Sequence, residues 1–191
     1  MLEAFGFVSG VVNVWLLARQ NIWNWPVGLA NNLAYLIVFA TGGLYGDSGL
    51  QVVYMTLGVY GWWKWLRRGN APGLAVTRAT TAVWMALTPV TLVSFVVLRW
   101  FLGRFTDSTV PMWDGLTTAL SLAAIWGQSR KLLESWWLWI LADLIYIPLY
   151  LYKGLWLTSL LYFVFLLLCF FGLREWMREL DASGAMQAQA G

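Results

Sequence analysis

The sequence predicts an all-α integral membrane protein with seven transmembrane helices arranged as three, one and three. Three observations predict this fold class. The 191 residues are 60% hydrophobic and only 11% charged, with a mean hydropathy of +0.65, whereas a soluble domain has about a quarter of its residues charged. Apolar runs of near-membrane length recur along the chain, and residues 19–67 recur in residues 130–178. We therefore expect lipid to cover most of the folded surface.

Seven apolar runs follow one another, separated by charged or Gly/Pro-containing breaks. A helix needs roughly 20 mostly apolar residues to cross about 30 Å of hydrocarbon, and the first and fifth runs are the shortest. No Lys or Arg precedes the first run, so we interpret it as a span and not as a cleaved signal peptide. The predicted spans are residues 2–18, 26–44, 49–66, 80–102, 112–127, 136–152 and 155–173.

The predicted topology places the N-terminus outside the cell and the C-terminus in the cytoplasm. Short cytoplasmic loops are enriched in Lys and Arg, and nine of the 12 basic residues lie on one side of the predicted spans, against three on the other. The predicted organisation is a first three-helix repeat (1–68), a linking helix with its loops (69–105) and a second three-helix repeat (106–178). Residues 179–191 become rich in Ala, Gln and Gly, so we expect a disordered cytoplasmic tail.

An internal repeat relates the two triplets of helices. Residues 19–67 align with 130–178 without a gap, and 13 of these 49 positions are identical, including Trp25/Trp136 and Tyr35/Tyr146. We call two residues at corresponding positions of this alignment repeat-mates. Because one helix separates the triplets, both enter the membrane in the same direction, which predicts a parallel repeat about an axis along the membrane normal. Such folds are transporters with a site between the halves. The alternative is a duplication that only stabilises a bundle.

Asp143 is the main candidate for a functional residue. It lies seven residues into the sixth span, near mid-depth, where a charge costs at least about 2.5 to 3.5 kcal/mol on insertion scales. Aromatic faces attract cations and a carboxylate supplies the countercharge, so its surroundings predict a site for a flat cationic ligand. The alternatives are a structural ion pair or a protonated hydrogen-bonding acid. Helical spacing places on one face Trp136, Trp139, Asp143, Tyr146 and Tyr150.

The second span carries neutral polar candidates at related positions. Asn32 is the repeat-mate of Asp143, and Asn31 is the neighbour of Asn32. Tyr35 follows one turn later. Buried amides need partners, and hydrogen bonds between helices and contacts with a ligand are both consistent with this pattern.

Polar and small residues also mark the third and first spans. Gln51 and Tyr54 share a helix face with glycines that allow a helix or a flat ligand to approach closely. Gly6 and Gly10 have the GxxxG spacing, which favours a helix contact. The complete set of predicted binding residues is Asn31, Asn32, Tyr35, Gln51, Tyr54, Trp136, Trp139, Asp143 and Tyr146.

The residue inventory excludes several classes of function. The chain has no His and a single Cys169, so it lacks internal disulfides and thiolate metal cages. No Walker loop, HExxH, GxSxG or nucleotide fingerprint occurs, so we predict no enzymatic activity, no ATPase, no metal and no cofactor. The net charge is +3 without a basic stripe, so we predict no nucleic-acid partner and interpret the charges as topology signals.

Four stretches resemble the PnuC family of bacterial vitamin transporters. They are WPVGLANNLAYLIVF (25–39), GLYGDSGLQVVY (43–54), YGWWKWLR (60–67) and WWLWILADLIYIPLYLYKGLWLTSLLYFVFLLLCFFGLREW (136–176). The resemblance implies a seven-helix fold similar to the SWEET transporters, in the bacterial inner membrane. It also implies import of nicotinamide riboside, an NAD precursor, by facilitated diffusion, with trapping by a cytoplasmic kinase that phosphorylates the vitamin. Relatives carry thiamine and riboflavin.

Matching the family's motifs residue by residue makes Gln51 a family glutamine, Asn31 a family asparagine, and Trp136 and Trp139 the family's aromatic pair. Asp143 departs from the pattern, because riboside carriers typically show an asparagine there. The nicotinamide pyridinium and the thiazolium of thiamine are permanent cations, so the carboxylate fits either. A vitamin-binding subunit with a separate ATPase, proton coupling through Asp143 and a homo-oligomer all stay open.

Overall fold

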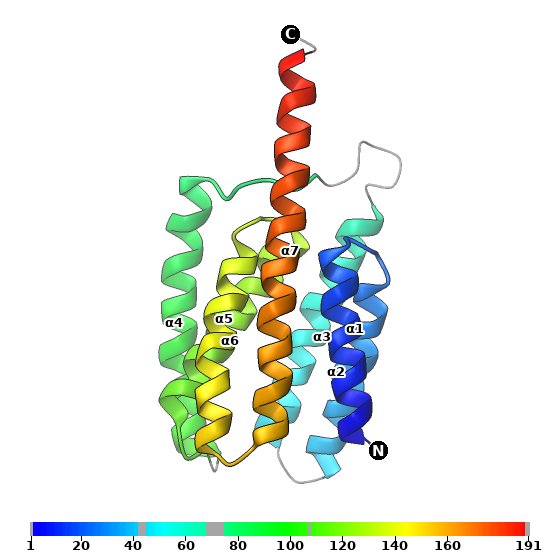
Figure 1. The fold of residues 1–191 in the computed structure, drawn as a ribbon. Helices are drawn as coiled ribbons and strands as arrows, with labels where there is room; N and C mark the ends of the chain where they lie inside the picture. The colour runs from blue at the N-terminus through cyan, green and yellow to red at the C-terminus, as the bar shows by residue number, and fades with distance from the viewer. Residues whose placement is uncertain (1, 42–44, 68–74, 107, 190–191) are drawn as a thin grey trace.

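The computed structural model describes residues 2–41, 45–67, 75–106 and 108–189, and these residues form a bundle of seven helices (Figure 1). Consecutive helices run in opposite directions, so α1 begins at one end of the bundle and α7 leaves from the other. Each helix overlaps one apolar run of the sequence, and α7 extends beyond its run. The helices are α1 (Leu2–Ala18), α2 (Asn24–Thr41), α3 (Tyr45–Leu66), α4 (Thr81–Phe105), α5 (Pro111–Ser129), α6 (Ser135–Tyr152) and α7 (Trp156–Gln189).

Local signals define several helix ends. Thr80 caps α4, because its side chain accepts a hydrogen bond from the Val83 amide at 3.4 Å. Pro111 occupies the first turn of α5, where its missing N–H would have no intrahelical partner. Gly154 has a φ of +73° in the turn between α6 and α7, a conformation that glycine adopts without steric cost.

Hydropathy differs between the helices according to what surrounds them. α4 has no buried residue, whereas most of α5 is buried and includes Thr, Ser and Gln side chains. A helix enclosed by protein can carry polar groups that a lipid-facing helix cannot. By length and composition alone, the described residues therefore contain three helices suited to cross a membrane, fewer than the seven expected. These are Thr81–Phe105, Ser135–Tyr152 and Trp156–Ser183.

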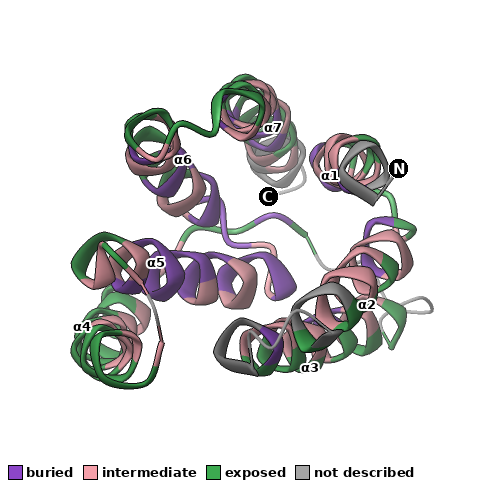
Figure 2. Cartoon of the chain, turned by 90° about the horizontal axis from the view of Figure 1, so that it is seen from below, coloured by how far each residue is buried: buried purple, intermediate pink, exposed green. Residues whose placement is uncertain are grey.

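Six of the helices form a closed ring (Figure 2). Each packs against the next in the order α1, α2, α3, α5, α6 and α7, and α7 returns to α1. α4 lies outside the ring and packs against α5. The first helix of each triplet thus contacts the third helix of the other, as a two-fold relation between the triplets requires.

The two triplets repeat their side-chain packing at corresponding positions of the alignment. Trp25 packs edge-on against Trp65 with ring centroids 5.4 Å apart and planes at 85°. Trp136 packs against Trp176 at 5.4 Å and 87°. The Ser48 hydroxyl likewise donates to the Leu36 carbonyl, and the Ser159 hydroxyl to the Ile147 carbonyl, each at 3.0 Å. The repeat found in the sequence is therefore present in local geometry, while the likeness to SWEET transporters stays a prediction.

Gln20 and Lys131 show where the pseudo-two-fold axis passes. They are repeat-mates with φ values of +53° and +54°, and the Lys131 Nζ donates to the Gln20 Oε1 at 2.6 Å. Residues related by a two-fold axis contact each other only close to that axis, so the axis runs between these side chains. We call this end of the ring the Lys131 end, and the opposite end the Lys153 end.

Residues 75–80, which precede α4, run across the Lys131 end (Figures 1 and 2). Val76 is only 2% exposed and belongs to the hydrophobic core that includes Trp136. The Thr77 amide donates to the Lys131 carbonyl at 3.1 Å, and the Leu133 amide donates to the Thr77 carbonyl at 2.9 Å. This end of the ring is therefore covered by the described segment that precedes α4.

Val76→Ala is expected to loosen this closure without unfolding the bundle. Removal of two buried methyl groups costs on the order of 1 to 2 kcal/mol, which is about a tenfold rise in local opening. Hydrogen exchange of the peptide containing Thr77 should rise accordingly. Val90→Ala makes the same change at a side chain that is 61% exposed and is the control. Equal exchange in both variants would contradict the closing role of Val76.

The C-terminal segment corrects one expectation. Residues 179–191 were expected to be disordered, whereas α7 continues as helix to Gln189 (Figure 1). Ala, Gln, Met and Glu have high helix propensity, and an apolar helix preceding them removes the cost of nucleation. Gln20 also donates a hydrogen bond from Nε2 to Glu179, which attaches the start of this segment to the ring.

Candidate substrate-binding site

Four tyrosines from α3, α6 and α7 form a cluster at the ring's interface between the halves. Ring centroids are 4.4 Å apart for Tyr146 and Tyr162, 5.1 Å for Tyr150 and Tyr162, and 5.6 Å for Tyr146 and Tyr150. Tyr54 lies close enough to Tyr146 and Tyr150 to interact with them electrostatically. We call these four residues the tyrosine cluster. It offers aromatic faces and hydroxyl groups to one ligand.

Two hydroxyl side chains of α5 contact this cluster. Thr117 and Ser121 are one turn apart, so they share a helix face. The Tyr146 hydroxyl lies close enough to interact with both, and the Tyr54 hydroxyl with Ser121. The Thr117 Oγ1 donates to the Trp113 carbonyl at 2.9 Å, so its oxygen can still accept a hydrogen bond. Hydroxyl groups of α3, α5 and α6 are thus brought together.

Asp143 lies beside the tyrosine cluster and is only 2% exposed. The Cys169 Sγ donates to the Asp143 Oδ2 at 3.5 Å, and Tyr146 and Tyr162 lie close enough to interact with the carboxylate. Ion pairs within the described residues involve other carboxylates. A buried carboxylate without a basic partner is costly, so either protonation or a cationic ligand would compensate it.

The predicted amides are placed differently from Asp143. Asn31 donates to the Ser9 hydroxyl at 2.6 Å and to the Gly6 carbonyl at 3.4 Å, so it joins α2 to α1. Of the two interpretations left open for this amide, the structure supports the hydrogen bond between helices. Asn32 and Gln51 are half-buried on α2 and α3. Their contact with a substrate stays a prediction.

The predicted tryptophans lie in the helix-packing core. Trp136 is 0% exposed and packs against Trp176, and Trp139 packs against the same hydrophobic core. The structure therefore shows Trp136 and Trp139 in contacts between helices, and their contact with a substrate stays a prediction. The predicted aromatic face of α6 therefore has two parts. Tyr146 belongs to the tyrosine cluster, whereas Trp136 and Trp139 pack against other helices. Tyr35 of α2 lies near Tyr150.

Tyr162, Thr117 and Ser121 belong to the candidate site, and reasoning from the sequence missed them. The repeat contains a signal for Tyr162, because it is the repeat-mate of Gln51, which was a candidate. The two α5 residues lie just outside the aligned repeat, and a gap-free extension of the alignment pairs them with the glycines of the GxxxG pattern. Extension of the alignment into α1 and α5 would therefore have found them.

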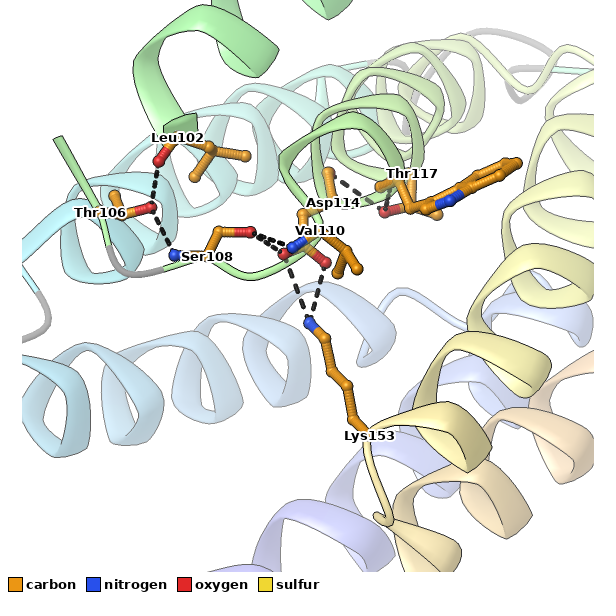
Figure 3. A network of polar contacts seen from close by, with 8 residues as sticks. Leu102, Thr106, Ser108, Val110, Asp114, Thr117 and Lys153 are labelled. Atoms are coloured by element: carbon orange, nitrogen blue, oxygen red, sulfur yellow. Dashed lines mark hydrogen bonds and ion pairs between the residues drawn. The ribbon is translucent and has the colours of Figure 1, made fainter. Parts of the chain in front are cut away.

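Polar contacts join two loops at the Lys153 end (Figure 3). The Lys153 Nζ forms an ion pair with the Asp114 Oδ1 at 3.2 Å, and the Ser108 hydroxyl donates to the Asp114 Oδ2 at 2.6 Å. Asp114 is in the first turn of α5, and the Thr117 Oγ1 lies 3.1 Å from its carbonyl oxygen. This network connects the α4–α5 and α6–α7 loops and approaches the tyrosine cluster.

Lys153→Gln is expected to lower the free energy of unfolding by no more than about 1 kcal/mol. Both side chains of the pair are about a quarter exposed, at 26% and 24%, so water weakens their attraction. High salt should reduce the difference between wild type and variant, since screening removes what remains. Thermal unfolding in detergent at low and high salt measures both effects. A loss of several kcal/mol would show that the pair is much less solvated than its exposure indicates.

Lys131 is held by several contacts at the opposite end. Its Nζ lies 4.7 Å from the Trp65 ring centroid in addition to its hydrogen bond with Gln20. Burial lowers the pKa of the Lys131 ammonium, and the nearby Glu179 carboxylate opposes that shift. The two ends of the ring therefore differ. The Lys131 end has a buried core that includes Val76, and the Lys153 end has a partly solvated ion pair.

Comparison with known proteins supports the interpretation that this ring of helices contains a transport site. The model of the nicotinamide mononucleotide transporter family matches residues 1–178. The chain belongs to this family. The resemblance to PnuC proteins noted from the sequence is thereby confirmed, and the chain is a multi-pass inner-membrane protein of a transporter family rather than of an enzyme family.

Relatives within the family differ in what their names say they carry. The riboflavin/roseoflavin transporter RibM of Streptomyces davaonensis is 29% identical over 178 residues, covering 91% of this chain and 83% of RibM. The nicotinamide riboside transporter PnuC of Escherichia coli is 24% identical, covering 96% and 88%. The crystal structure of the vitamin B3 transporter PnuC superposes with a TM-score of 0.75 at 23% identity, over 95% and 82% of the two chains, which shows the shared fold.

Proposed function

We propose that this chain imports nicotinamide riboside by facilitated diffusion. The observation that carries the proposal is Asp143, a carboxylate that is 2% exposed, has no basic partner in the described part of the chain and adjoins the tyrosine cluster. The pyridinium ring of the riboside is a flat permanent cation. A carboxylate and aromatic faces both favour such a group, and desolvation strengthens the attraction.

The two halves of the ring would expose this site alternately to the two sides of the membrane. The halves related by the pseudo-two-fold axis meet at α1 with α7 and α3 with α5, so rocking at these two interfaces would open one end and close the other. The distribution of basic residues supports a cytoplasmic location for the Lys131 end. The riboside would then enter at the Lys153 end, leave at the Lys131 end and be retained when a cytoplasmic kinase phosphorylates it.

Riboflavin is the second candidate substrate. RibM is the relative with 29% identity, and stacked tyrosines suit a flat neutral ring as well as a charged one. The thiazolium cation of thiamine would pair with the Asp143 carboxylate in the same way as the pyridinium of the riboside. A vitamin-binding subunit with a separate ATPase is less well supported, because the chain has seven helices in related triplets and would provide both halves of a complete carrier.

The test is uptake by purified protein in liposomes without ATP or ion gradients. Labelled nicotinamide riboside, riboflavin and thiamine are compared in turn. Saturable riboside uptake supports the proposal, and uptake of riboflavin or thiamine alone would replace it with the corresponding vitamin. If purified protein binds a vitamin but moves none, a missing partner becomes the better hypothesis.

A further inference from the structure

The pseudo-two-fold symmetry of the ring is broken at two pairs of corresponding positions on α1 and α5. When the alignment of the repeats is extended without a gap, Gly6 and Gly10 on α1 correspond to Thr117 and Ser121 on α5. All four face aromatic residues of neighbouring helices. The same backbone position therefore carries a hydrogen atom in one half and a hydroxyl-bearing side chain in the other.

On the glycine side, aromatic side chains occupy the space that a Cβ would fill. The Tyr35 hydroxyl end lies against Gly6, and the Phe165 ring lies against Gly10. Phe165 comes from α7 and packs edge-on against Tyr162 with centroids 5.5 Å apart. This side of the cluster therefore consists mainly of ring surface.

On the hydroxyl side, the corresponding neighbours are Tyr146 and Tyr54, which are the repeat-mates of Tyr35 and Phe165. The Tyr146 hydroxyl lies close enough to interact with Thr117 and Ser121, and the Tyr54 hydroxyl with Ser121. Thr117 is 0% and Ser121 is 3% exposed. Four hydroxyl groups thus meet where the other half has two glycines, one tyrosine and one phenylalanine.

We propose that Thr117 and Ser121, together with the Tyr54 and Tyr146 hydroxyls, select substrates that carry a hydroxylated sugar or chain beside a flat ring. The inference rests on the proposed function and assigns the polar half of its substrate to the α5 side of the tyrosine cluster. Hydroxyl groups both donate and accept, so those of a substrate can form hydrogen bonds with these side chains. An analogue without them leaves the buried hydroxyls incompletely paired when it binds.

The test compares ligands that differ only in the hydroxylated part. Nicotinamide riboside is paired with N1-methylnicotinamide, which keeps the pyridinium cation, and riboflavin is paired with lumiflavin, which keeps the flavin ring. Calorimetry measures the binding of each ligand to detergent-solubilised protein. In wild type, we expect the hydroxylated member of one pair to bind at least tenfold more tightly than its partner.

The double variant Thr117→Val/Ser121→Ala should lower this preference about tenfold by weakening only the hydroxylated ligand. Tyr54→Phe removes a single hydroxyl and should act in the same direction by several-fold. The controls are Thr118→Val, at the next buried position of α5, and Tyr60→Phe, nearer the end of α3. Neither should change the preference.

The outcomes separate the inference from the proposed function. If wild type prefers riboflavin and the double variant loses that preference, the selection by hydroxyls stands and the riboside assignment fails. Suppose that wild type binds the riboside. If Tyr54→Phe and the double variant then weaken the binding of nicotinamide riboside and of N1-methylnicotinamide equally, the hydroxyls have a packing role and the inference is overturned. Failure of wild type to bind any of the four ligands would overturn both.

Discussion

Asp143→Asn lowers uptake of nicotinamide riboside about tenfold or more while the variant folds like wild type. The amide has nearly the shape of the carboxylate and can still accept the hydrogen bond from Cys169, so packing between α6 and α7 is kept. The substitution removes only the charge. Loss of a charged partner in a buried site costs about 1.5 to 3 kcal/mol, which corresponds to this change in uptake.

Uptake into liposomes and thermal unfolding of the same preparation check the two parts of this expectation. Asp181→Asn makes the identical change at an exposed position of α7 and should leave uptake unchanged. Binding of a neutral ligand should also be little affected by Asp143→Asn. Unchanged riboside uptake in this variant would remove Asp143 from the site and with it the main support for a cationic substrate.

Gly172→Val is expected to lower the free energy of unfolding by about 3 kcal/mol. A Cβ at Gly172 would lie within the space of the Trp136 ring, which is fully buried and held edge-on by Trp176. Neither ring has a free direction in which to move, so the helices must separate to accept a larger side chain. Overpacking of this kind typically costs about 1 to 3 kcal/mol and occasionally more.

The symmetry of the bundle provides matched variants for this prediction. Gly61→Val should have a similar effect, because the Trp25 ring occupies the corresponding space. Gly49→Val is the control, since a Cβ there meets nothing within 4 Å. Thermal unfolding and the yield of monodisperse protein measure the effects. If all three variants unfold at the temperature of wild type, the glycines are not required for the tryptophan packing.

Much of the architecture could be predicted because it depends on patterns local in the sequence. Apolar runs predicted every helix, since each must bury its backbone polar groups within itself in lipid. The alignment of the two repeats related Trp25 to Trp136, whereas only the structure shows that each packs edge-on against another tryptophan. The tail was missed because its polarity was interpreted as disorder, whereas its helix propensity and continuity with α7 make it helical.

The sequence by itself determined the helices, the repeat, the family and Asp143 as a buried acid that needs an explanation. Only the tertiary structure decided which residues surround that acid. Trp136 and Asn31 lie in contacts between helices, while Thr117 and Ser121 entered the candidate site. The physical reason is that periodicity shows which residues share a helix face, whereas the rotation and pairing of helices decide what that face meets. In a membrane bundle almost every face is apolar, so this rotation cannot be derived from hydropathy alone.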